Sequence, residues 1–180
     1  MSELEKLADL VSERNRISKT ISKLIGRPAL LRHIGEYIAS KIFNIELEES
    51  ATSKGIDGRF TERPLKGKTV NIKLYGKREG FLDISLGNLA DCYLVLTGPK
   101  SEPTSSRGTS RPLVISNAYL FNMGELLKEL RRRKVKIGMA TSVASMYWQE
   151  AKIYPDNMNR TILMTEWQTD QLKLFSPTKD

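Results

Sequence analysis

The chain has little of what builds cross-linked or membrane-embedded proteins. It contains one cysteine, Cys92, which excludes an internal disulfide. No apolar run approaches the roughly 20 residues that a helix needs to cross a bilayer. Residues 1–5 are acidic and amphipathic and do not resemble a secretory signal peptide. We therefore expect a soluble protein of the cytoplasm, in which Cys92 is a buried small apolar residue beside the run 93–96.

Positive charge is in excess. Lysine and arginine total 29 against 21 acidic residues, which gives a formal net charge of +8. A domain this basic is a candidate for binding a polyanion such as nucleic acid. The alternative is a surface whose charges are only solvated, because many basic proteins do not bind nucleic acid.

The length of 180 residues fits a single domain, 1–180, with a sizeable core. Within it we expect an N-terminal helix over 1–25, a core over 26–135 and a C-terminal helical extension over 136–180. No internal repeat is visible in the sequence.

Helical spacing of apolar residues begins near the N-terminus. Ser2 and Glu5 match a capping box, and the helix that they begin should end at Gly26. A second helix spans about 29–44 and carries Glu36 away from its most apolar line. Further helices are expected over residues 122–133, 142–152 and from 165 onward.

Alternating apolar residues predict the strands. Residues 69–75 place Asn71 and Lys73 on the same, less apolar face. We expect a turn centred on Arg78 to join this strand to the next in a hairpin, which sets Lys73 opposite Asp83. The fold class is therefore α/β (α+β-like), with a mixed central sheet of four or five strands flanked by helices. The other expected strands cover residues 55–60, 81–86, 93–97 and 113–115.

Strand pairing gathers polar side chains on one face of this sheet. Counting back across the turn at Pro64 places Asp57 within one residue of Asn71, beside Lys73 and Asp83. Carboxylates that hold Mg²⁺, with a lysine that orients water or stabilises developing charge, suit phosphodiester hydrolysis. The alternative is a cross-strand salt bridge between Lys73 and Asp83, which stabilises little at a surface.

Two short motifs resemble those of a known superfamily. The segment Gly-Ile-Asp57, followed after a loop by Val-Asn71-Ile-Lys73, resembles the bipartite motif of PD-(D/E)XK nucleases. The helix segment Leu-Arg-His33-Ile-Gly-Glu36 resembles the helix that adds an acid to that site. Residues 25–98 also resemble a small prokaryotic family of unknown function.

The resemblance implies a restriction-endonuclease-like core and a Mg²⁺- or Mn²⁺-dependent DNA endonuclease, restriction- or repair-like. Its catalytic residues would be Lys73, Asp57, Glu36 and Asn71. The metal ligands would be Asp57, Glu36 and Asn71, with Asp83 added by the predicted register. A homodimer is expected, because cleavage of a duplex needs two active sites.

Asn71 departs from the motif, which has an acidic residue at this position. An amide oxygen can bind a hard cation but brings no charge. A second hypothesis is therefore a nuclease-like fold that binds nucleic acid or a protein partner without cutting. A third is a structural subunit of a larger assembly.

Basic residues crowd the turns and the loop around the expected site. Salt-dependent contacts with phosphates are their predicted role, and solvation alone is the alternative. His33 lies one helical turn before Glu36, as a proton carrier or as a helix-packing residue. The expected phosphate-binding residues are Arg59, Lys66, Lys68, Lys77, Arg78, Arg107 and Arg111.

Overall fold

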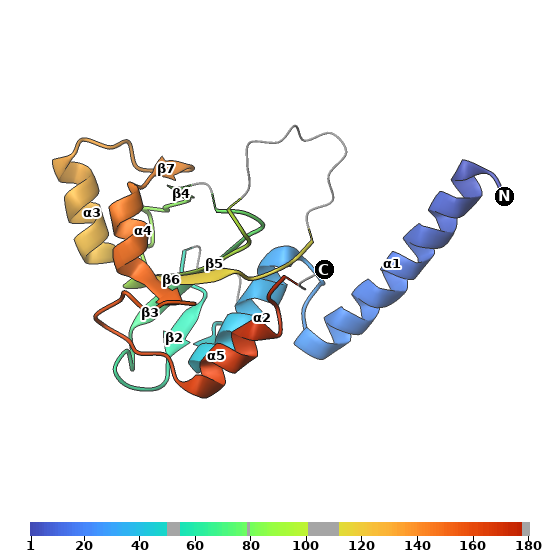
Figure 1. Ribbon diagram of the computed structural model, residues 1–180, viewed down its shortest axis with the longest axis horizontal. Helices are drawn as coiled ribbons and strands as arrows, with labels where there is room; N and C mark the ends of the chain where they lie inside the picture. Colours follow the sequence, from blue (N-terminus) through green and yellow to red (C-terminus); the bar gives the residue numbers. More distant parts are fainter. Residues whose placement is uncertain (50–54, 79, 101–111, 178–180) are drawn as a thin grey trace.

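The computed structural model describes residues 1–49, 55–78, 80–100 and 112–177 (Figure 1). Helices and strands alternate irregularly along these residues. The helices are α1 (Glu3–Ile25), α2 (Leu31–Phe43), α3 (Met123–Arg132), α4 (Ser145–Ala151) and α5 (Glu166–Lys173). The strands are β1 (Ile45–Leu47), β2 (Gly58–Phe60), β3 (Thr69–Tyr75), β4 (Phe81–Leu82), β5 (Cys92–Thr97), β6 (Asn117–Asn122), β7 (Thr141–Ser142) and β8 (Lys152–Tyr154).

A mixed sheet forms the centre of the fold. Within the described ranges it has six strands in the order β1-β2-β3-β5-β6-β8. β3 and β5 run parallel, and every other neighbouring pair runs antiparallel. All residues of β5 are buried, as expected of a strand covered on both faces. The predicted mixed α/β class is confirmed, and the sheet is larger than the four or five strands expected.

Two hydrophobic layers cover the sheet. On one face α2 and α5 pack over alternate residues of β3 and β5 such as Ile72 and Leu94. On the other face α3, α4 and the small β4–β7 sheet pack over residues such as Tyr93 and Val95. Figure 1 shows α1 running away from this layered body. No helix in the described part of the chain is long and apolar enough to span a membrane.

The capping signals in the sequence set the helix ends correctly. Ser2 and Glu5 form the reciprocal hydrogen bonds of a capping box at the start of α1. Gly26 ends that helix with φ 69°, a left-handed conformation that glycine adopts without steric cost. Asn122 caps α3, and Thr165 begins α5 through a second capping box.

Some predicted strands are wrong. β4 does not form a hairpin with β3: it pairs with β7 in a separate two-stranded sheet, and it is far shorter than the expected 81–86. Residues 113–115 are not a strand, because Ile115 bonds instead to the carbonyl of Phe175, and the strand begins at Asn117. The segment 136–180, expected to be helical, contributes β7 and β8.

Candidate functional site

The site is built where β2 and β3 separate. These strands pair at two positions, and Gly58 opposite Val70 is the last of them. One residue earlier, the Asp57 side chain accepts a hydrogen bond at Oδ2 from the backbone N–H of Ile72 over 2.7 Å. The carboxylate thus takes the place of a strand partner for the Ile72 N–H, beyond the point where β2 stops pairing with β3. The prediction that Asp57 lies within one residue of Asn71 is confirmed.

Gly58 is required at this fork. A Cβ at residue 58 would lie 2.4 Å from the carbonyl oxygen of Glu46 on the neighbouring β1. The close backbone approach of β1 therefore excludes any side chain at residue 58, directly after Asp57.

A second close approach brings Glu36 to the same place. α2 lies so near β3 that a Cβ at Gly35 would be 2.7 Å from Cβ of Leu74. The next residue along the helix is Glu36, which is only 2% exposed. A glycine at this position therefore lowers the helix onto the strand and buries the neighbouring carboxylate.

Two arginines neutralise Glu36. Arg27 Nη1 donates to Glu36 Oε2 over 2.9 Å, and Arg32 Nε lies 3.1 Å from Oε1. Arg27 also donates from Nη2 to the carbonyl oxygen of Glu48 over 2.7 Å. Buried carboxylates need such partners, because an unpaired charge in a protein interior is costly.

Burial raises the pKa values of both carboxylates, and the charge of Asp57 adds to the effect at Glu36. Burial raises the pKa of Glu36, the nearby charge of Asp57 raises it further, and Arg32 and Arg27 oppose both effects. Burial also raises the pKa of Asp57, while the Ile72 N–H and the Lys73 ammonium lower it. A pair of acids with raised pKa values beside several cations is typical of functional sites, although structural ion-pair networks produce it too.

Asn71 and Lys73 complete the arrangement. Asn71 is 5% exposed, and its Oδ1 is a buried acceptor without a hydrogen-bond partner in the described structure. The Lys73 Nζ lies 5.6 Å from the centroid of the Tyr93 ring, which restricts the ammonium by a cation–π contact. We refer to Glu36, Asp57, Asn71 and Lys73 as the acid–lysine cluster.

Asp83 is not part of this cluster. The predicted hairpin register is wrong, because Lys73 pairs with Val95 of the parallel strand β5. Asp83 Oδ1 accepts from the backbone N–H of Ala140 over 2.7 Å, and its own N–H donates to the Tyr75 hydroxyl. Two predictions depended on that hairpin register: Asp83 as a replacement metal ligand, and a cross-strand salt bridge between Lys73 and Asp83. The observed strand pairing supports neither.

The donor set for a metal is correspondingly small. No group of three or more His, Cys, Asp or Glu side chains that could hold a metal ion is found among the described residues. The cluster offers two carboxylates and one amide oxygen, all hard oxygen donors that Mg²⁺ or Mn²⁺ accepts. The buried Asn71 Oδ1 without a partner fits a cation, because native structures rarely leave such an atom unsatisfied.

The predicted phosphate-binding residues are scattered. Arg59 is exposed and lies 3.8 Å from Glu48, and Lys66 is exposed in the turn before β3. Arg78 is half-buried and donates to the Tyr119 hydroxyl over 3.1 Å, so its guanidinium is held against the body. Lys77 is half-buried beside it. These positions fall at both ends of β3, with the acid–lysine cluster between them.

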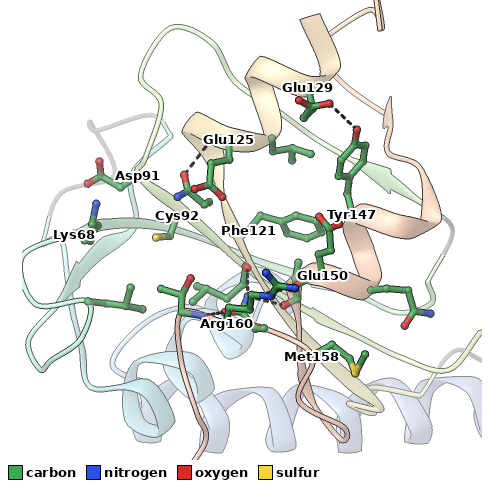
Figure 2. Close-up of a pocket in the computed structure, with 18 residues that line it drawn as sticks. Lys68, Asp91, Cys92, Phe121, Glu125, Glu129, Tyr147, Glu150, Met158 and Arg160 are labelled. Carbon is green, nitrogen blue, oxygen red and sulfur yellow. Dashed lines mark hydrogen bonds between the residues drawn. The ribbon is translucent and has the colours of Figure 1, made fainter. Parts of the chain in front are cut away.

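The other three predicted phosphate-binding residues are Lys68, Arg107 and Arg111. Arg107 and Arg111 fall outside the described residues. Lys68 directly precedes β3 and lines a cavity of about 590 Å³. Figure 2 shows that cavity, whose lining comes from α3, α4 and the segment 158–161 and carries several carboxylates. None of the acid–lysine cluster lines it within the part of the chain that the structure describes.

Three residues near the cluster were not predicted from the sequence. Arg32 stands one helical turn before Glu36, and this (i, i+4) spacing was a usable signal. Arg27 and Tyr93 are joined to the cluster only by tertiary contacts. His33 approaches the Pro28 carbonyl oxygen at 2.9 Å through Nδ1, which supports its reading as a helix-packing residue.

Comparison with known proteins adds no assignment: neither a scan against protein-family models nor a search of curated proteins found a match for this chain.

Proposed function

We propose that the chain hydrolyses phosphodiester bonds in DNA, with a Mg²⁺ or Mn²⁺ ion bound at the acid–lysine cluster, in the manner of PD-(D/E)XK nucleases. The observation that carries the proposal is the buried Asn71 Oδ1 without a partner, next to Asp57 and Lys73. An unsatisfied buried acceptor costs about 1–3 kcal/mol, so its persistence in a polar site favours a ligand.

Each residue of the cluster has a defined task in this proposal. Asp57, Asn71 and Glu36 would hold the ion, which when bound neutralises charge on the phosphate and lowers the pKa of water. Lys73 places its ammonium beside Asp57, where it can orient a water molecule or stabilise negative charge on the scissile phosphate. The Tyr93 ring limits the range of that ammonium.

Basic groups at the two ends of β3 support a polyanionic substrate. Arg59 and Lys66 are exposed at one end of the strand. Phosphates that contact such residues would position the backbone without reading its sequence. Binding should weaken as the salt concentration rises, because each neutralised phosphate releases counterions.

A plasmid nicking assay with Mg²⁺ or Mn²⁺ tests the proposal. We expect nicking by the unmodified protein, its loss in EDTA, and its loss in Asp57→Ala and Lys73→Ala. Lys128→Ala is the matched control, because Lys128 is an exposed lysine on α3 and its removal should leave nicking unchanged. Activity that survives EDTA or either cluster variant would contradict the mechanism.

A second function, DNA binding without cleavage, is favoured by the ion pairs of Glu36. Both of its oxygens are engaged by arginines, and Asn71 supplies no charge. This function predicts salt-sensitive DNA binding, no nicking with either metal, and no heat of Mn²⁺ binding in calorimetry. The two functions therefore differ in two independent measurements.

A further inference from the structure

α1 is a long helix that, apart from a small contact with α2, packs against little of the described structure. Its 23 residues extend about 34 Å, and none of them is buried. It leaves the layered body at its C-terminal end and runs outward (Figure 1). Caps at both ends define the helix, but in proteins most of the stability of a helix comes from packing of its apolar face, which α1 lacks here. A helix in this position needs something to pack against.

The outward helix carries an apolar stripe. Leu4, Leu10 and Leu24 are 77%, 63% and 71% exposed, whereas the apolar face of an amphipathic helix is normally covered. The positions Leu7, Leu10, Arg14, Ile17, Ile21 and Leu24 follow one another at intervals of three and four residues, which is the spacing of a coiled-coil seam.

Charge divides the same helix into two halves. Residues 3–13 carry four acids and one lysine, whereas residues 14–25 carry four basic residues and no acid. Two such helices side by side in parallel would place like charges together. In the antiparallel orientation each acidic half lies along the basic half of the other helix.

The seam is also symmetric under reversal. If two copies cross antiparallel, Leu7 shares a layer with Leu24 of the second copy, Leu10 with Ile21, and Arg14 with Ile17. Every layer then pairs a heptad a position of one helix with a d position of the other. The same register holds along the whole seam, because the paired residue numbers always have the same sum. Arg14 is the one polar member, and a single polar seam residue selects register at some cost in stability.

We propose that α1 is a self-association helix that pairs antiparallel with α1 of a second copy of this chain. The occupant is a second copy because the apolar layers and the charge halves are complementary to the helix itself. Such a two-fold arrangement buries the same surface on both copies. The inference stands apart from the proposed nuclease, since no residue of the acid–lysine cluster takes part.

The mass in solution tests the association. Multi-angle light scattering across a range of concentrations should show a transition from the 20.4 kDa chain to twice that mass. Leu10→Asp should weaken the association at least tenfold. Ser12→Asp adds the same charge on the opposite face of α1 and should leave it unchanged. Since these side chains are exposed on α1 and do not contact the core, the melting of the layered body should be the same in both variants.

Cysteine cross-linking tests the orientation. Leu7→Cys combined with Leu24→Cys should form an intermolecular disulfide under mild oxidation, and Leu7→Cys alone should not. Cross-linking by the single variant would show a parallel pair and would overturn the orientation. Cys92 is buried and is the background control.

Two other outcomes would overturn the proposal itself. One is a monomer at every concentration. The other is a monomer that binds vesicles of anionic lipid through α1, which would assign the apolar stripe to a membrane surface. Nicking activity needs no measurement here, so failure of this test is separate from failure of the proposed nuclease.

Discussion

Arg27 joins three parts of the chain through one guanidinium: Nη1 donates to Glu36 on α2, and Nη2 donates to the Glu48 carbonyl oxygen just after β1. The residue itself belongs to the short link between α1 and α2. It therefore fixes the link against the helix and the end of β1 while it neutralises a buried acid.

Removal of this guanidinium should be costly. We expect Arg27→Ala to destabilise the protein by about 3 kcal/mol, because Glu36 would keep a buried charge with one partner fewer. Glu36→Gln in the same background should recover a large part of the loss. Arg32→Ala, which removes a more exposed partner, should cost less than about 1 kcal/mol. Urea unfolding of the three variants and the unmodified protein measures these differences, and equal costs for Arg27→Ala and Arg32→Ala would contradict the assignment.

Asp57→Asn should make the protein more stable at neutral pH. Burial raises the pKa of Asp57, so the folded state binds more protons than the unfolded state, and stability falls as pH rises through that raised pKa. Asparagine cannot lose a proton and can still accept from Ile72 N–H. The melting temperature of the variant should exceed that of the unmodified protein at pH 7–8, by roughly 2–4 °C for each kcal/mol.

The difference in melting temperature should shrink as the pH falls toward about 4, the ordinary range of an aspartate. Thermal melts between pH 4 and pH 8 measure it. A variant less stable than the unmodified protein at pH 8 would show that its carboxylate is favourably paired. Nicking activity should be lost in the same variant.

Asn71→Asp tests the metal directly. A third carboxylate next to Asp57 should strengthen Mn²⁺ binding at least tenfold in titration calorimetry, because hard cations prefer charged oxygen ligands. The same change should lower stability without metal, since like charges would be crowded. Asn88→Asp, an exposed substitution of the same chemistry, is the control and should alter neither quantity. Unchanged affinity in Asn71→Asp would remove this position from the ligand set.

Gly35→Ala should separate the helix from the sheet. A methyl group 2.7 Å from Leu74 Cβ must push α2 away from β3, and we expect a loss of about 1–3 kcal/mol. Gly124→Ala on α3 has room for its methyl group and should be neutral or stabilising by up to about 1 kcal/mol. Chemical unfolding compares the two. The Gly35 variant should also lose nicking, because Glu36 moves with its helix.

Lys73→Gln should separate chemistry from binding. We expect the nicking rate to fall about 10²- to 10³-fold, as when a stabilising donor is lost from a reacting centre. DNA affinity should change less than about threefold, because one phosphate contact out of several is affected. Single-turnover nicking and fluorescence anisotropy measure the two quantities. Equal losses in rate and affinity would make Lys73 a binding residue.

The sequence predicted the parts of the fold that local chemistry determines. Ser2, Asn122 and Thr165 cap helices through bonds to residues two or three positions away, so their pattern is readable in the chain. The alternation of β3 and the apolar run of β5 likewise follow from the residues themselves. The proximity of Asp57 to Asn71 was predictable because β2 and β3 are consecutive in the chain and only residues 61–68 separate them.

Long-range pairing was not predictable in the same way. The hairpin expected around Arg78 was reasonable from the turn residues, but β4 finds its partner about 60 residues later in β7. β1 was missed because three residues carry too little pattern. The burial of Glu36 depends on Gly35 meeting Leu74, and no local property of α2 encodes that contact.

Strand β8 is the last strand of the central sheet to be synthesised. The acid–lysine cluster and Tyr93 are complete once the first half of the chain has been made, whereas β8 closes the sheet beside β6 only at residues 152–154. At about 5–20 residues per second, the edge of β6 stays unpaired for roughly 2–6 seconds between synthesis of Asn122 and synthesis of Tyr154. Through this interval the nascent chain presents an unpaired strand, so slower translation after β6 should increase its capture by chaperones.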